Sequence, residues 1–311
     1  MTAKVRHFLD TDDVSIETLR GLLQLAQAVK QAPERYAHEL DGRVLGMVFQ
    51  KPSTRTRVSF EVAMLQMGGH ALYFNAQDLQ LGRGETVADT ARVLSRYVDG
   101  IVARVFAHAD VVTLARYASV PVINGLSDYL HPCQVLADLL TLWEKKGRLE
   151  GLRLAYVGDG NNVCHSLLLA GSRLGLHLRV ATPPGFEPHP EVVDRARSYA
   201  RSSGGRVLWT SDPGEAVAGA DAVYTDVWAS MGQEHERAYR VQVFRPYQVN
   251  ATLMGQARPD VIFMHCLPAH RGEEVTDDVI DGPASVVWDQ AENRLHTQKA
   301  LLLWLFHRVT L

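Results

Sequence analysis

Short apolar segments alternate with amphipathic segments along almost the whole chain, and this alternation limits the possible folds more than any other feature. In the first half, the apolar segments expected as strands are 44–49, 71–74, 101–103 and 120–123. The segments expected as helices are 57–67, 86–97, 111–118 and 132–146. Strands that alternate with helices are typical of parallel sheets covered by helices, so the pattern indicates an α/β fold.

The second half repeats this alternation after two glycines, Gly147 and Gly151. The strands expected there are 154–157, 178–181, 207–209, 222–224, 261–264 and 285–288, and the apolar segment 300–309 is expected as a buried closing helix. We therefore predict two domains, each a mostly parallel sheet flanked by helices, with the C-terminal helix packing back on the first domain. The expected limits are 1–146 plus 293–311 for the first domain and 147–292 for the second.

The composition of the 311 residues is that of a globular protein, with 46% hydrophobic and 22% charged residues. A formal net charge of -3 argues against a nucleic-acid-binding protein, which would need clustered excess Lys and Arg. No apolar stretch reaches the roughly 18–20 residues of a membrane helix. The three cysteines are far apart in sequence, which fits a reducing compartment. The sequence therefore predicts a cytoplasmic protein without a membrane segment.

Polar side chains follow several of the expected strands, where loops of an open parallel sheet bind ligands. The segment 51–57 reads Lys-Pro-Ser-Thr-Arg-Thr-Arg and lies between a strand and a helix. Ser53 or Thr54 can cap that helix, whose N-terminus attracts an anion. Arg55 and Arg57 add donors that phosphate accepts. The pattern predicts a phosphate site, although an ordinary capped helix with solvated arginines would have the same local sequence.

Four further groups of polar residues occupy comparable positions. Arg104 follows a strand, and His131-Pro132-Cys133-Gln134 opens a helix with side chains that can donate to a carbonyl. The turn at 158–162 carries Gly158-Asp159-Gly160, a weak dinucleotide motif because the third glycine is missing, and its asparagines suit an amino-acid head group. The fourth of these groups consists of two segments that follow strands, 226–232 and 265–274.

The His and Cys residues could form two other kinds of site, a metal site or a thiol nucleophile. A metal site would draw on His131, Cys133, His265, Cys266 and His270, but their spacing matches no common zinc pattern. A thiol nucleophile at Cys266 would need an activating base. His265 is adjacent in a strand and therefore points to the opposite face, so it is poorly placed for that role.

The order and content of these motifs resemble those of the aspartate/ornithine carbamoyltransferase family over essentially the whole chain. The carbamoyl-phosphate motif is similar to Ser53–Arg57, Arg104 and His131-Pro132-x-Gln134. The ornithine branch of the family is indicated by Asp226-x-Trp228-x-Ser230-Met231-Gly232 and by His265-Cys266-Leu267-Pro268. The aspartate branch has a catalytic Lys in the loop that corresponds to 81–86, which here contains no Lys, although Arg83 is conceivable as a substitute.

The resemblance implies an α/β enzyme of arginine metabolism (a urea-cycle type step) that converts carbamoyl phosphate and L-ornithine into L-citrulline and phosphate. It implies a trimer or an assembly of trimers that needs no metal or organic cofactor. It implies that Arg55, Arg104, His131, Asp226 and Cys266 are catalytic. The residues it assigns to carbamoyl phosphate are Ser53, Thr54, Arg55, Thr56, Gln80 from a neighbouring subunit, Arg104, His131, Gln134, Cys266, Leu267 and Arg294. Those it assigns to ornithine are Asn162, Asp226, Ser230 and Met231.

Three alternatives remain open from the sequence. Within the same class, the accepting amine could be putrescine, an N-acylated ornithine or aspartate. A non-catalytic nucleotide-binding module would rest on the Gly158-Asp159-Gly160 turn, but it would leave the arginines after the first strand unexplained. A purely structural protein would not need polar side chains at five strand ends. The roles of Asp226 and Cys266 in proton transfer, and the biosynthetic or catabolic direction, are not distinguished by these patterns.

Overall fold

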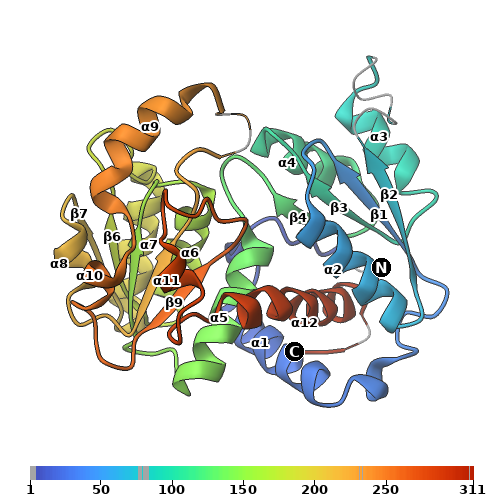
Figure 1. The fold of residues 1–311 in the computed structure, drawn as a ribbon. Coiled ribbons are helices and arrows are strands. Elements are labelled where there is room, and N and C mark those ends of the chain that lie inside the picture. Colours follow the sequence, from blue (N-terminus) through green and yellow to red (C-terminus); the bar gives the residue numbers. More distant parts are fainter. Residues whose placement is uncertain (1–4, 76–78, 80–83, 231, 233, 308) are drawn as a thin grey trace. The chain divides into compact units, whose positions relative to one another are not determined.

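The computed structural model describes residues 5–75, 79, 84–230, 232, 234–307 and 309–311. The chain divides into two compact units (Figure 1). Unit 1 contains Met1–Leu140 and Asn293–Leu311, and unit 2 contains Thr141–Glu292. The chain passes between the units within two helices, α5 (Pro132–Lys146) and α12 (Val287–Leu305).

Unit 1 contains a four-stranded sheet with the order β2-β1-β3-β4, in which all described pairs are parallel. Its strands are β1 (Val44–Phe49), β2 (His70–Asn75), β3 (Gly100–Arg104) and β4 (Val122–Leu126). Its helices before α5 are η1 (Thr11–Asp13), α1 (Ile16–Gln31), η2 (Pro33–Tyr36), α2 (Thr54–Gln66), α3 (Val87–Leu94) and α4 (His108–Tyr117).

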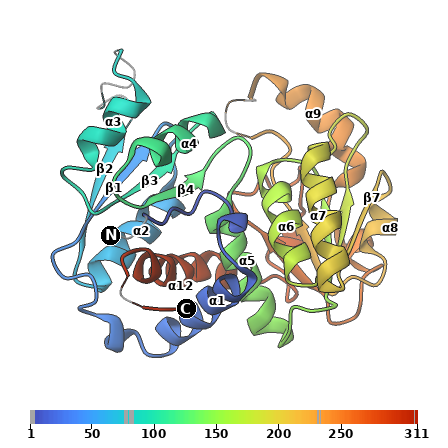
Figure 2. The ribbon, with the colours of Figure 1, turned by 180° about the vertical axis from the view of Figure 1, so that it is seen from behind.

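Helix α1 illustrates how local sequence and packing combine in unit 1. The Ser15 side chain caps it by accepting a hydrogen bond from the Thr18 backbone N–H at 3.1 Å. Its buried apolar residues recur at helical spacing and form one stripe: Leu19, Leu22, Leu23, Ala26 and Val29. Helices α1 and α12 come from opposite ends of the chain and lie side by side (Figures 1 and 2). Lys30 Nζ donates to Asn293 Oδ1 at 2.9 Å between them.

Unit 2 contains a five-stranded sheet with the order β7-β6-β5-β8-β9, again parallel in every described pair. Its strands are β5 (Arg153–Val157), β6 (His177–Ala181), β7 (Arg206–Thr210), β8 (Ala222–Thr225) and β9 (Ile262–His265). Its helices are α6 (Asn162–Arg173), α7 (Pro190–Ser203), α8 (Pro213–Val217), η4 (Glu234–Glu236), α9 (Arg237–Phe244), η5 (Arg245–Tyr247), α10 (Ala251–Met254) and α11 (Asp277–Ile280).

The core of unit 2 forms where the strands present apolar side chains to the helices. Val157, Val223 and Phe263, from three neighbouring strands, are fully buried in one cluster with residues of α8 and α11. Among the helices that the structure describes, none combines the length and the hydrophobicity that crossing a bilayer requires.

The predicted fold class is confirmed: both units are parallel α/β structures, and the C-terminal residues from Asn293 belong to unit 1. The predicted strands agree with β1–β9 to within two residues at each end, except that β4 ends at Leu126, three residues later than predicted. The strand predicted at 285–288 is wrong, because only Ser285 makes an isolated bridge, to Phe263, and Val287 already begins α12. The closing helix predicted at 300–309 begins at Val287 instead, since its first half is too polar to be recognised by hydrophobicity alone.

Candidate functional site

The N-terminus of α2 forms one side of the candidate anion site in unit 1. Ser53 is the N-cap, as predicted, and its Oγ accepts a hydrogen bond from the Thr56 backbone N–H at 3.2 Å. Thr54 and Arg55 occupy the first turn, where backbone N–H groups and the helix dipole favour an anion. In the sheet, Phe49 at the end of β1 is the register partner of Arg104 at the end of β3. This pairing brings Arg104 next to the segment that leads into α2.

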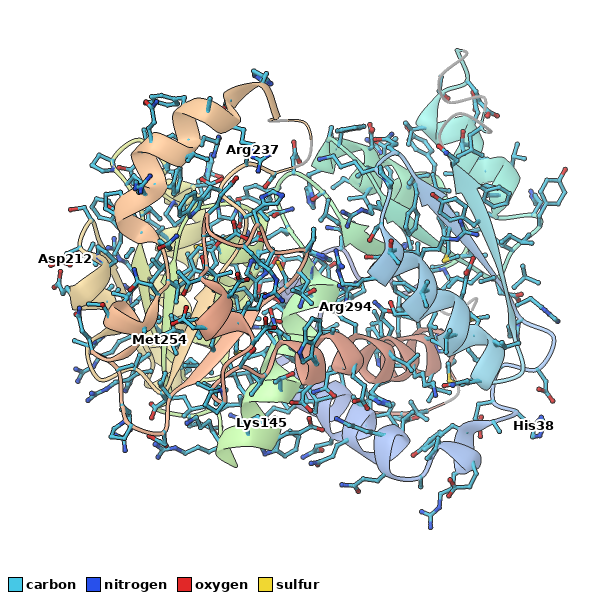
Figure 3. The ribbon with its side chains drawn as sticks, viewed as in Figure 1. His38, Lys145, Asp212, Arg237, Met254 and Arg294 are labelled. Carbon is cyan, nitrogen blue, oxygen red and sulfur yellow. The ribbon has the colours of Figure 1, made fainter. Side chains whose placement is uncertain are left out.

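A buried arginine from α12 joins α2 and α5. Arg294 (labelled in Figure 3) donates from Nη1 to Gln134 Oε1 at 2.7 Å and from Nη2 to Thr56 Oγ1 at 3.1 Å. Gln134 in turn donates from Nε2 to Asp138 Oδ1 at 2.8 Å. All four side chains are buried. Three segments that are distant in sequence therefore meet in one hydrogen-bonded chain.

His131 lies among the arginines of this site. Burial lowers its pKa well below the ordinary 6.5, and the charges of Arg294, Arg104 and Arg55 lower the pKa further. The imidazole is therefore neutral at physiological pH, so it can donate one hydrogen bond without bringing a charge. The three arginines make this region locally positive in a chain with an acidic net charge.

Two residues of the predicted motifs point elsewhere. Arg57 is exposed, pairs with Glu61 at 3.1 Å and lies over the ring of Tyr73. Cys133 is buried with its Sγ 3.4 Å from the Asn124 carbonyl, and burial raises the pKa of its thiol to about 12. Cys133 is therefore a protonated core residue, and Arg57 stabilises the surface of α2.

In unit 2, the carboxylate of Asp226 is the centre of a second cluster. Its Oδ1 accepts hydrogen bonds from the Cys266 thiol at 2.9 Å and from the Val227 backbone N–H at 2.8 Å. Its Oδ2 accepts from Asn161 Nδ2 at 2.8 Å. Thr225 and His265 are register partners at the ends of β8 and β9, so the residues that follow them, Asp226 and Cys266, lie side by side.

His265 supports the turn that carries Cys266 and Leu267. Its Nδ1 accepts the Leu267 backbone N–H at 2.8 Å, so its proton resides on Nε2, which faces Glu274 Oε1 at 3.2 Å. Leu267 has a φ of 58°, an unusual value for a branched side chain, which the surrounding contacts must hold. Both nitrogens of His265 are thus engaged away from the Cys266 thiol, in agreement with the strand geometry expected from the sequence.

The turn at 158–162 packs against this cluster. Asn161 caps α6 through its Oδ1, which accepts from the backbone N–H groups of Val163 and Cys164, and Tyr156 donates to the same oxygen at 3.2 Å. A Cβ on Gly160 would lie 2.3 Å from the Pro188 backbone nitrogen. The glycine is therefore required by close packing of two loops, and no dinucleotide is needed to explain it.

A buried ion pair fixes the same turn to the segment after β8. Arg240 donates from Nη1 to Asp159 Oδ2 at 3.1 Å and to the Trp228 carbonyl at 2.9 Å. Burial raises the pKa of Asp159 to about 6, while the charge of Arg240 acts in the opposite direction. The pair links α9 to two loops of the candidate site and restricts their movement.

The residues weighed for a metal site are distributed over both units, His131 and Cys133 in unit 1 and the other three in unit 2. Among the described residues, two groups offer ligand atoms close together: Asp226, His265 and Cys266, and His270, Glu273 and Glu274. Both ring nitrogens of His265 already take part in hydrogen bonds, which argues against the first group.

The structure thus assembles most of the predicted residues into two clusters, one in each unit. Asn162 begins α6 beside the cap, and Ser230 follows the segment of Asp226 and Trp228. Gln80 and Met231 lie outside the described residues. Sequence reasoning missed the supporting residues Asp138, Tyr156, Asn161 as a cap, Arg240 and Glu274. The spacing of Gln134 and Asp138, four residues apart on one helix, was the one local signal available for these residues.

The chain is similar to known proteins over its full length. The family profile described as "Aspartate/ornithine carbamoyltransferase, carbamoyl-P binding domain" matches residues 6–144, and the one described as "Aspartate/ornithine carbamoyltransferase, Asp/Orn binding domain" matches residues 150–305. An ornithine carbamoyltransferase of Pyrococcus horikoshii is 61% identical over 307 residues, which cover 98% of this chain and 97% of the relative.

Two further comparisons involve Pyrococcus furiosus. Its protein named "Ornithine carbamoyltransferase, anabolic" is 62% identical over 299 residues, 96% of this chain and 95% of that protein. The solved structure of the ornithine carbamoyltransferase from the same organism superimposes with a TM-score of 0.95 at 59% identity and covers 100% of both chains.

The lowered pKa of His131 predicts a particular pH dependence of stability. Below pH 6.5 the unfolded chain binds a proton at His131 that the folded protein does not, so the free energy of unfolding should fall as the pH falls. The loss attributable to this residue should approach about 1.4 kcal/mol per pH unit. Denaturant titrations between pH 6.5 and pH 5 should give a shallower slope for His131→Gln than for the parent. The control His38→Gln removes an imidazole that is 85% exposed and should keep the parent's slope; equal slopes for all three proteins would contradict the assignment.

Proposed function

The chain belongs to the aspartate/ornithine carbamoyltransferase family, and we propose that it transfers the carbamoyl group of carbamoyl phosphate to the side-chain amine of L-ornithine, giving L-citrulline and phosphate. The observation that carries the proposal is the full-length identity of about 60% to relatives that bear the name ornithine carbamoyltransferase. One of these relatives is named anabolic, which supports the biosynthetic direction and a place in arginine biosynthesis.

Unit 1 is proposed to bind carbamoyl phosphate. The phosphate would accept hydrogen bonds at the α2 N-terminus from Ser53, Thr54 and Thr56, and it would meet the charges of Arg55 and Arg104. As phosphate departs, its negative charge grows, and groups placed in advance to receive that charge lower the barrier. The three arginines near the neutral His131 support this role.

The carbonyl oxygen of the carbamoyl group also becomes more negative as the amine attacks. We propose that His131 and Arg55 donate hydrogen bonds to this oxygen, and that Gln134 and Arg294 hold the carbamoyl amide. A neutral His131 fits this role because one ring nitrogen can donate a hydrogen bond to the carbonyl oxygen. Donors of this kind contribute roughly 2.7–4 kcal/mol each to lowering a barrier.

Unit 2 is proposed to bind ornithine through Asn162, Asp226, Ser230 and Met231. An alkylamine has a reference pKa of about 10.4, so it must lose a proton before it can attack. The 2.9 Å hydrogen bond from Cys266 to Asp226 provides a path: the amine proton passes to Cys266 Sγ as the thiol proton passes to Asp226 Oδ1. Leu267 would exclude water from the reacting groups. The steps proposed here use no metal and no organic cofactor, as the family resemblance implies.

We propose that residues 1–146 and 293–311 form the domain that binds carbamoyl phosphate. Residues 147–292 form the domain that binds ornithine. We also propose that the protein acts as a homotrimer or an assembly of trimers in the cytoplasm. Gln80 of a neighbouring subunit would then complete each phosphate site.

The accepting amine is identified by a substrate panel. Purified protein with radiolabelled carbamoyl phosphate should carbamoylate L-ornithine with a kcat/KM at least about a hundredfold above that for putrescine, N-acetylornithine or L-aspartate, since each competitor leaves a buried polar group unpaired. A preference for any of the three competitors would replace the proposed substrate and leave the family assignment intact.

Arg55 should be essential for turnover, whereas Arg57 in the same turn of the helix should not. Arg55→Ala removes a cation that meets charge growing in the transition state, so kcat should fall by a hundredfold or more, equivalent to about 2.7 kcal/mol. Arg57→Ala removes an exposed pair with Glu61 and a contact with the Tyr73 ring, both outside the proposed site, and should stay within threefold of the parent. Steady-state citrulline formation measures both. An Arg55→Ala enzyme that keeps a tenth of the parental kcat would contradict the assignment.

Cys266 should assist proton transfer without forming a covalent intermediate. Cys266→Ser keeps a hydrogen-bonding group and should retain partial activity, and Cys266→Ala, which breaks the path to Asp226, should retain less. Cys164→Ala, at a buried thiol of α6, is the control and should retain parental kcat. Mass spectrometry that traps a carbamoyl thioester at Cys266 during turnover would overturn the proposal in favour of covalent catalysis.

Shared sites between subunits are tested by mixing two inactive variants. Arg55→Ala and Gln80→Ala chains, unfolded and reassembled together in equal amounts, give a working site only where one chain supplies Arg55 and its neighbour supplies Gln80. Random assembly should restore about one quarter of the sites. Activity no higher than that of the parents, despite confirmed subunit exchange, would rule out the shared site. A fully active Gln80→Ala protein would show that Gln80 has no role.

A further inference from the structure

A basic cavity of about 700 Å³ lies in unit 2 among residues that the proposed reaction does not use. It is formed where β5, β6 and β7 begin, together with residues of α7. The cationic residues that line it are Arg153, Arg179, Arg197, Arg201 and Arg206. All lining residues belong to the described part of the chain, and none of them is Asp or Glu. A cavity of this size is within the range of about 300–1,000 Å³ that holds small molecules.

The pairing of the strands concentrates the positive charge. In the sheet, His177 at the start of β6 is the register partner of Arg153 on β5 and of Arg206 on β7. Residues in register on neighbouring strands project to the same face, so these three side chains form a row. Arg179, two residues further along β6, points to the same face. Strand β7 is at the edge of the sheet, with α7 beside it (Figures 1 and 2).

These arginines are not neutralised within the described chain. None of the five forms an ion pair with a described carboxylate, whereas Arg237, Arg240, Arg258 and Arg271 of the same unit all do. Within the described chain, the guanidinium of Arg179 donates to the carbonyls of Glu215 and Ala218, which are neutral acceptors. Like charges held together without counter-ions destabilise a fold, so the cluster indicates an anionic ligand.

His177 independently indicates that the cavity binds a ligand. Its Nδ1 atom is buried and has no hydrogen-bond partner among the described residues, although the residue lines the cavity. Burial and the charges of Arg206, Arg153 and Arg179 lower the pKa of its imidazole, so the arginines are close enough to act on it. A ligand oxygen in the cavity would satisfy this nitrogen and lie between the guanidinium groups.

The cavity is separate from the proposed ornithine site. Arg153, His177 and Arg206 are the first residues of their strands. Asn162, Asp226 and Cys266 follow the carboxyl ends of β5, β8 and β9. Because all strands of this sheet are parallel, the two groups lie at opposite edges of the sheet.

We propose that this cavity is a binding site for a small polyphosphate, a compact molecule with several linked phosphate groups, such as a nucleoside triphosphate. Several guanidinium groups match several phosphates through bidentate hydrogen bonds. Leu208, which is 41% exposed, and Val207 form an apolar part of the lining that can contact a base. The formal net charge of -3 disfavours a long nucleic acid, which would meet repulsion beyond the cavity.

The test measures binding of inorganic tripolyphosphate to the full chain by calorimetry at 0.15 M salt. The parent should bind it, and Arg197→Gln/Arg206→Gln should weaken binding at least about tenfold, because two charged phosphate contacts are lost. Arg35→Gln/Arg245→Gln removes the same charge outside the cavity and should bind as the parent does. Arg55→Ala should also bind as the parent does, which separates this cavity from the proposed phosphate site at α2. ATP in a parallel titration reports whether a base adds affinity.

Each outcome has a definite consequence. Parental binding by Arg197→Gln/Arg206→Gln would overturn the proposal, and so would equal weakening by the control pair, which would indicate non-specific attraction. Loss of binding in Arg55→Ala alone would place the ligand at α2 and also overturn it. Correct folding of the double variant is checked by its melting temperature and by an unchanged kcat for citrulline formation. Tighter binding of ATP than of tripolyphosphate would identify a nucleotide, and the reverse order a simple polyphosphate; both support the site.

Discussion

Parallel hydrogen bonding between the strands is the constraint on which the rest of this structure depends. A parallel pair cannot be closed by a short hairpin, so each strand must be followed by a crossover, here usually a helix. All strands of a sheet then end at one edge, and the segments that follow them become neighbours whatever their distance in sequence. The register places Arg104 beside the end of β1 in unit 1, and it places Asp226 beside Cys266 in unit 2. Both candidate clusters therefore form at the edge where the strands of their sheet end.

The hydrogen-bond partners of the buried charges explain why each cluster favours one kind of ligand. A buried charge is tolerated where hydrogen bonds replace the lost water. Arg294 meets this condition with two neutral acceptors, Gln134 and Thr56, so its own positive charge is not cancelled by them. Asp226 accepts hydrogen bonds from a thiol, an amide and a backbone N–H, and none of these three donors is a cation. The cluster around Arg294 therefore keeps a positive charge suited to phosphate, and the cluster around Asp226 keeps a negative charge suited to an ammonium group.

Sequence patterns were sufficient for the strands, for the cap at Ser53 and for the polar residues at strand ends, because each depends on neighbours within a few residues. They failed where the decisive contact is distant. The segment 285–288 is apolar enough for a strand, but it makes a single bridge to β9, at Ser285, before α12 begins. No sequence pattern predicted that Arg240 would pair with Asp159 or that Glu274 would contact His265. Gly160 looked like part of a nucleotide motif, although its packing against Pro188 is the reason for its small size.

The two edges of the sheet in unit 2 differ in whether their charged side chains have partners of opposite charge. This difference distinguishes two kinds of binding site, which neither the net charge nor the fold does. At the carboxyl edge, Asp159 is paired with Arg240, and Asp226 accepts hydrogen bonds from Cys266, Val227 and Asn161, so both carboxylates have partners within the protein. At the amino edge, the row from Arg153 through His177 to Arg206 has no ion-pair partner among the residues that the structure describes. Preorganisation at the first edge lowers the cost of ordering a site for chemistry. At the second edge, the arginines repel one another, and an anion would relieve this repulsion on binding. The same sheet therefore has a prearranged site at its carboxyl edge and an unneutralised positive surface at its amino edge.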